Sequence, residues 1–104
     1  MDFKDFQGRT IELSETSWQH IQEQHPDVTI DDIKRVLSDP LEVRESPRLG
    51  FVELFYQAKA HQTGKMRFHM VVVKVLSAGN FVSTAMTTAT MKSGRTLYKK
   101  KDPK

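Results

Sequence analysis

The sequence predicts a single α+β domain, in which an N-terminal two-helix hairpin packs on a four-stranded antiparallel β-sheet. The 104 residues suffice for one hydrophobic core but not comfortably for two. Two helix-start signals lie before Pro40, and after it the chain changes to the alternation and β-branched residues typical of strands. We expect the domain to span residues 1–98 and residues 99–104 to form a basic, flexible tail.

Capping residues define the two predicted helices. Ser14 can cap a helix over Glu15–Gln24, which should stop at His25 because a residue that precedes proline is disfavoured in the helical conformation. Thr29 can cap a second helix that ends by Asp39-Pro40. The residue before each cap is apolar and can pack on the fourth helical residue, as Leu13 can on Trp18.

Short turns between the later apolar segments predict an antiparallel meander. A short additional edge strand over Thr10–Leu13 is possible, and turns are expected near residues 47–50, 62–64 and 77–80. The alternating valines of the third strand suggest that it is central in the sheet. The four predicted strands are Leu41–Glu45, Phe51–Ala58, Arg67–Leu76 and Phe81–Met86.

Charge is distributed unevenly along the chain. Residues 1–58 carry six Lys and Arg against twelve Asp and Glu, a net charge of −6, whereas residues 59–104 carry ten against one, a net charge of +9. A clustered positive charge of this kind favours contact with a polyanion such as RNA. Alternatively, the two halves neutralise each other in the fold.

The composition excludes several classes of site. With no cysteine, the chain has no disulfide, thiolate metal site or cysteine nucleophile. It also lacks an apolar run of membrane-spanning length and a secretory leader pattern, so we expect a cytoplasmic protein without a membrane partner. Neither a metal-ligand spacing nor a glycine-rich phosphate loop is visible, so no metal or cofactor is predicted.

Two histidines lie on the first predicted helix, at its middle and its end. His25 falls on the face of Trp18 and Ile21, whereas His20 points away from it, so the two cannot ligate one ion from an intact helix. At the end of a helix, His25 could act as a general acid or bind phosphate, or it could simply bond to the last helical carbonyls. His20 could equally be a solvated surface residue.

Other candidates lie in the second half of the chain. Tyr56 alternates with apolar residues, so its hydroxyl needs a partner if it is buried. Thr84 belongs to a hydroxyl-rich strand end that Lys92 and Arg95 follow. Hydroxyls followed by cations can hold a phosphate through charge-assisted hydrogen bonds, although such residues also occur on ordinary surfaces.

The order of motifs resembles a known group. The segments "WQHIQEQHPD", "LSDPLEVRES", "ELFYQ", "MRFHMVVVKVL" and "FVSTAMTTATMKSGRTLY" are similar to the phage-associated nuclease-like domains of the barnase/EndoU/colicin/RelE-like (BECR) fold, over Thr10 to Tyr98. The resemblance implies two helices before a four-stranded sheet, and a metal-independent ribonuclease of toxin or phage-effector type. The positions that carry over are His20, His25, Arg44, Ser46, Tyr56, Thr84 and Lys92. The chain departs from the pattern at Gln24, where a basic residue is usual, and at Met86, where an aromatic is usual.

These observations suggest an endoribonuclease in which the ribose 2′-OH attacks the adjacent phosphate. His25 would serve as acid or base with His20 as the alternative, and Lys92 and Arg44 would stabilise the phosphate. Tyr56 and Thr84 would orient the phosphate or substitute in proton transfer. Ser46 and Arg95 would add phosphate contacts. The alternative is a non-catalytic module of the same fold that binds RNA or a protein through its basic face. A protein inhibitor is a further possible partner, and the oligomeric state is not predicted.

Overall fold

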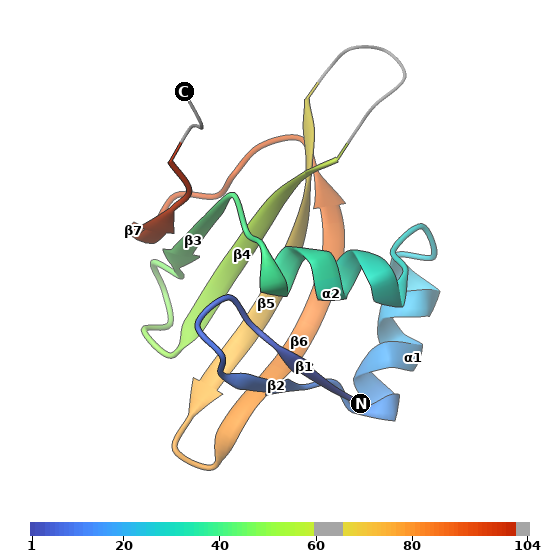
Figure 1. Ribbon diagram of the computed structural model, residues 1–104. Helices are drawn as coiled ribbons and strands as arrows, with labels where there is room; N and C mark the ends of the chain where they lie inside the picture. The colour runs from blue at the N-terminus through green and yellow to red at the C-terminus, as the bar shows by residue number, and fades with distance from the viewer. Residues whose placement is uncertain (60–65, 102–104) are drawn as a thin grey trace.

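Within the described residues, the chain forms a seven-stranded sheet with two helices on one of its faces (Figure 1). The structure is a computed structural model that describes residues 1–59 and 66–101. The expected turn at residues 62–64, His61 and the end of the expected tail at 102–104 lie outside the described residues. The elements are β1 (Asp2–Lys4), β2 (Thr10–Glu12), α1 (Glu15–Gln24), α2 (Ile30–Ser38), β3 (Glu42–Glu45), β4 (Val52–Lys59), β5 (Arg67–Leu76), β6 (Gly79–Thr88) and β7 (Arg95–Lys99).

Both helices begin at the predicted caps. The Ser14 hydroxyl accepts a hydrogen bond from the Ser17 backbone N–H at 3.1 Å. At α2, Thr29 and Asp32 satisfy each other's backbone N–H groups at 3.1 and 3.0 Å, which makes a complete capping box. Helix α1 ends where expected, with the His25 N–H bonded to the Ile21 carbonyl. The local signals were therefore sufficient to place both helices.

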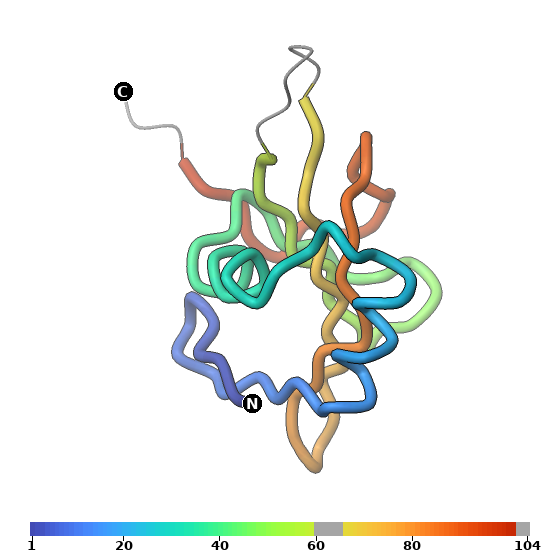
Figure 2. Tube along the Cα trace, turned by 90° about the vertical axis from the view of Figure 1, so that its right-hand side faces the viewer, coloured from blue at the N-terminus to red at the C-terminus, as the bar shows by residue number. Residues whose placement is uncertain are grey.

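The two faces of the sheet differ in what covers them. The strand order is β1-β2-β6-β5-β4-β3-β7, so β5 lies at the centre, as its valines predicted. One face packs against the helices around a core that includes Ile21, Ile33, Phe55 and Val71. We call the opposite face the open face. Figure 2 shows α2 on one side of the sheet, and the segments that follow β3 and β6 on the other.

A smaller apolar cluster lies on the open face. Because successive side chains of a strand alternate between faces, residues paired across strands form rows. One row is Glu42, Tyr56, Met70 and Met86, and the next is Arg44, Leu54, Val72 and Thr84. Val52, Leu54, Tyr56 and Met70 are buried there, with Phe68, Val72, Met86 and Met91 packed against them.

The predicted sheet was wrong in several respects. The four predicted strands exist, but β1, β2 and β7 extend the sheet to seven strands. Strand β2 is not an edge strand, because it pairs antiparallel with β1 and parallel with β6. Lys99 lies in β7 rather than in a tail, and the Lys100 N–H donates to the Leu41 carbonyl. The sheet is thus mixed, and β7 extends to Lys99.

The helices also do not form the expected hairpin. Helix α1 packs on β6, whereas α2 packs on β1, β4 and β5. Each helix buries its apolar face on different strands, because those strands offer more apolar surface than the narrow stripe of a neighbouring helix. Among the described residues, no helix is long and apolar enough to cross a membrane.

Candidate functional site

A cleft of about 630 Å³ lies on the open face. Its floor is apolar and comes from β4, β5 and β6, including Leu54, Met70, Val72 and Met86. Its walls are polar and include Ser46 and Arg48 from the segment after β3, Thr84 from β6, and Lys92 from the segment after β6. Three residues singled out in the sequence, Ser46, Thr84 and Lys92, therefore line one cleft.

Two further predicted residues, Tyr56 and Arg44, fix the position of Lys92. The Lys92 backbone N–H donates to the Tyr56 hydroxyl at 3.0 Å, and the Lys92 carbonyl accepts from Arg44 Nη1 at 2.8 Å. The backbone N–H and C=O of Lys92 are thus both bound by side chains, from β4 and β3 respectively. These two bonds fix the backbone of Lys92, from which its side chain extends at the wall of the cleft.

Close packing at Gly94 holds the same segment. A Cβ atom at this position would lie closer than 3.0 Å to the carbonyl oxygen of Glu45, a backbone atom that cannot move aside. Only glycine allows the chain to approach β3 this closely before it enters β7. The segment between β6 and β7 is therefore fixed at Lys92 by hydrogen bonds and at Gly94 by contact.

Behind Lys92, Tyr56 and Glu42 are paired directly across β3 and β4. The Tyr56 side chain is fully buried, and burial raises the pKa of its phenol, so the hydroxyl is protonated at neutral pH. Glu42 is 5% exposed; its carboxylate pairs with Arg44 Nε and accepts from the Thr96 hydroxyl at 3.3 Å. The positive charge of Arg44 is accordingly partly neutralised.

The remaining cations divide into paired and unpaired groups. Arg95 pairs with Glu45 at 2.8 Å, Lys59 with Asp27 at 3.2 Å and Lys100 with Asp39 at 2.9 Å, so part of the charge of the second half is neutralised by the first. Lys92 and Arg48 are exposed and form no ion pair within residues 1–59 and 66–101. The cleft therefore presents two cations that are available to a ligand.

A second hollow continues along the open face. It measures about 500 Å³ and includes Phe68, Met91, Lys99 and Lys101 among its lining residues. Met91 lines this hollow and Lys92 lines the first, so the segment after β6 separates the two. Each of the two hollows thus combines apolar side chains with cations.

The predicted histidines lie elsewhere. Helix α1 packs on the helix-covered face of β6, and His20 lines a separate hollow of about 340 Å³ with Glu23 and Ser83. His25 caps the end of α1 through its backbone, and its carbonyl accepts from the Val28 N–H at 3.1 Å. The structure does not bring either imidazole to the open-face cleft, whose lining contains no histidine among the described residues. At that cleft, neither histidine is available as an acid or base.

Sequence reasoning missed three residues of this site: Glu42, Arg48 and Gly94. The sequence places Glu42 and Arg44 on one face of a strand, which could have indicated an ion pair, and Arg48-Leu49-Gly50 has the polar, glycine-containing character of a loop. No local signal indicated that Gly94 contacts Glu45, because the contact depends on the pairing of β3 with β7.

No group of three His, Asp or Glu side chains in residues 1–59 and 66–101 is arranged to hold a metal ion. The donor set of the open-face cleft instead combines ammonium, guanidinium and hydroxyl groups, which suits an anionic oxygen. Comparison with protein-family models, with curated proteins and with solved structures gave no match to this chain.

Proposed function

We propose that the protein binds single-stranded RNA on the open face of its sheet. The observation that supports this proposal most is the convergence of Ser46, Thr84 and Lys92 in one cleft, with Tyr56 and Arg44 bound to the Lys92 backbone. These five residues lie between positions 44 and 92 and come from β3, β4, β6 and the segments that follow β3 and β6. Their convergence supports a common ligand.

The chemistry of the cleft fits a phosphodiester with an unstacked base. Lys92 and Arg48 can pair with phosphate oxygens, and the hydroxyls of Ser46 and Thr84 can donate to them. The apolar floor around Met70, Val72 and Met86 can take the face of a base that is not stacked in a duplex. The second hollow, with Lys99 and Lys101, would extend the path of the strand.

Metal-independent cleavage of the bound RNA is the second candidate function. It is favoured by the buried Glu42 and Tyr56 side chains and the partly buried Arg44 side chain next to Lys92. A carboxylate can accept the proton of the ribose 2′-OH, a protonated phenol can supply one to the leaving oxygen, and cations can stabilise the phosphorane. In this structure the phenol is buried and Glu42 is paired with Arg44, so cleavage requires the segment after β6 to move aside.

One experiment tests both functions. A fluorescent single-stranded RNA is titrated with protein at several salt concentrations in EDTA, and the same samples are run on a denaturing gel. We expect binding that weakens steeply with salt because counterions are released, and weaker binding of a duplex of the same sequence. Absence of RNA binding at low salt would refute the RNA proposal.

Cleavage is assigned with two substitutions. Products that appear in EDTA and vanish in both Glu42→Gln and Tyr56→Phe, at protein concentrations that saturate the RNA with each variant, would establish a ribonuclease at this cleft. Binding without products would leave the non-catalytic function. Products that persist in both variants and in Lys92→Ala would place the chemistry elsewhere or in a contaminant.

A further inference from the structure

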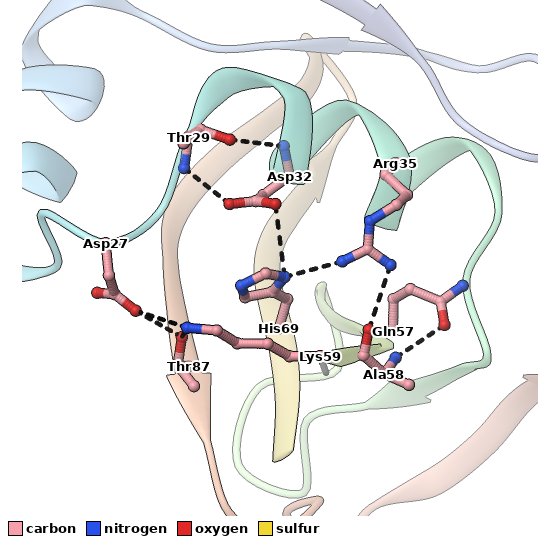
Figure 3. A network of polar contacts seen from close by, with 9 residues as sticks. All are labelled: Asp27, Thr29, Asp32, Arg35, Gln57, Ala58, Lys59, His69 and Thr87. Carbon is pink, nitrogen blue, oxygen red and sulfur yellow. Dashed lines mark hydrogen bonds and ion pairs between the residues drawn. The ribbon is translucent and has the colours of Figure 1, made fainter. Parts of the chain in front are cut away.

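A polar network lies on the helix-covered side of the sheet, where β4 and β6 end and β5 begins (Figure 3). We call it the rim network. It lies across the sheet from the open-face cleft and contains none of the residues that line that cleft. Its members are Asp27, Asp32, Arg35, Lys59, His69 and Thr87. Arg67 borders it as the cross-strand partner of Lys59.

His69 is the most deeply buried member, with 5% of its surface exposed. Its Nδ1 lies 2.9 Å from Arg35 Nη2 and 3.8 Å from an Asp32 carboxylate oxygen. A guanidinium can only donate, so Nδ1 accepts and the proton of the neutral ring lies on Nε2. That Nε2–H is buried and has no hydrogen-bond partner in the described part of the chain.

The same strand carries a second buried donor that lacks a hydrogen-bond partner within the described residues. Arg67 lies two residues before His69, so both side chains leave β5 on the same face. Its Nε is buried and, within the described residues, is also unpaired. Lys59 is the cross-strand partner of Arg67, and Thr87 that of His69. Two unsatisfied donors beside an ammonium and a hydroxyl are a site for an acceptor.

In this structure Asp27 is the acceptor for two of these four groups, Thr87 and Lys59. Its carboxylate accepts from the Thr87 hydroxyl at 2.8 Å and from Lys59 Nζ at 3.2 Å. In Figure 3, Nδ1 of His69 faces Arg35, and the other ring nitrogen, Nε2, faces the side where Lys59 and Asp27 lie. Asp27 follows α1 in a loop, and its side chain is 50% exposed, so it can turn out into solvent without disrupting the core.

We propose that the rim network is a binding site for a phosphate group, in which Asp27 is an intramolecular occupant that a phosphate displaces. A carboxylate has two oxygens and reaches only Thr87 and Lys59 here, whereas a phosphate has enough oxygens to accept also from His69 Nε2 and Arg67 Nε. Arg35, Lys59 and Arg67 supply three positive charges against the two carboxylates of Asp27 and Asp32. Loss of Asp27 from the site leaves it strongly cationic.

The site is independent of the proposed RNA cleft, so its test uses inorganic phosphate and a nucleoside 5′-monophosphate rather than RNA. Binding to the full-length chain is measured by calorimetry, and the His69 ring signals are followed by nitrogen-detected NMR. Removing the competing carboxylate in Asp27→Ala should tighten binding of inorganic phosphate on the order of tenfold. Asp31→Ala, which removes an exposed carboxylate of α2, is the charge-matched control and should bind as the wild type does.

Two results decide the proposal. In the double variant Asp27→Ala/Lys59→Met the gain should disappear, and in the wild-type protein phosphate at high concentration should shift the His69 Nε2 signal. The proposal is wrong if Asp27→Ala binds no more tightly than Asp31→Ala and the wild-type Nε2 signal does not move. Asp27→Asn, which removes the charge and keeps an acceptor, replaces Asp27→Ala if the latter unfolds. Tighter binding of the nucleotide than of inorganic phosphate would identify a phosphate monoester as the ligand.

Discussion

The hydroxyl of Tyr56 accepts a hydrogen bond from the backbone N–H of Lys92 at 3.0 Å, across 36 positions of the sequence. The phenol is buried in the apolar cluster of the open face, and Lys92 lies exposed above it. A core residue thus determines where a surface cation is held. The side chain that we expect to contact RNA thus depends on one that is buried in this structure.

Replacing Tyr56 by Phe tests this dependence. The substitution leaves the Lys92 N–H without its acceptor, so the free energy of unfolding should fall by about 1–3 kcal/mol. RNA binding should weaken as well, because Lys92 loses its fixed position. Urea unfolding and RNA titration measure the two effects. Tyr98→Phe is the control, since the Tyr98 hydroxyl forms no hydrogen bond with the described residues, and it should change neither quantity appreciably.

Gly94→Ala should be strongly destabilising. The added methyl would collide with the Glu45 carbonyl, and relieving the collision requires β7 to separate from β3. We expect a loss of about 2 kcal/mol or more in the free energy of unfolding. Gly50→Ala is the matched control, because its added methyl would approach other atoms no closer than 3.9 Å. Equal unfolding midpoints for the two variants would contradict the close approach at Gly94.

Lys92→Gln should weaken RNA binding and should also make the binding constant less sensitive to salt. If Lys92 neutralises one phosphate, the slope of log K against log salt should become shallower by about 0.7, the value for one contact with a single strand. Lys34→Gln removes an exposed lysine from α2 on the other side of the sheet and should leave the slope unchanged. A slope that responds equally to both substitutions would indicate only the net charge of the protein.

The stability of the protein should fall in mild acid because of His69. Burial, followed by the neighbouring cations Lys59 and Arg35, lowers the pKa of this imidazole from the ordinary 6.5, against the opposing effect of Asp32. The unfolded chain therefore binds the proton first as the pH falls, so stability decreases from about pH 6.5 downward until the folded protein is protonated too. Urea unfolding between pH 7.5 and 5 should show this decrease, and the decrease should be smaller in His69→Gln. Parallel curves for the two proteins would exclude His69 as its source.

The pattern of apolar residues predicted the helices and the four strands β3, β4, β5 and β6 well. The caps at Ser14 and Thr29 and the proline after His25 act through bonds within a few residues, so the local sequence suffices to locate them. Strand β1 has only three residues, and β7 is mostly polar and exposed, so neither has the alternation that identifies a strand. Their pairing comes from neighbours that the chain reaches only after folding.

The candidate site shows the same division. Tyr56, Thr84 and Lys92 could be selected from residue type and motif order, and the fold places them together. His25 was expected near them because it faces the core from the end of α1. The expectation failed because a sheet has two faces, and α1 covers the one opposite to Tyr56. His69 was assigned to a strand with no role beyond a possible phosphate contact, since a single histidine in a strand gives no sign of the arginine that contacts it from α2.

The sequence by itself determined where helices begin and end, which strands alternate, and which half of the chain is basic, because these properties depend on neighbouring residues. Only the tertiary structure decided which residues, distant in the sequence, lie together on one face of the sheet. It paired the cations at Lys59, Arg95 and Lys100 with carboxylates of the first half and left Lys92 and Arg48 facing the open-face cleft. The reason is geometric, since strand register and helix placement fix the distances between residues that no local pattern relates.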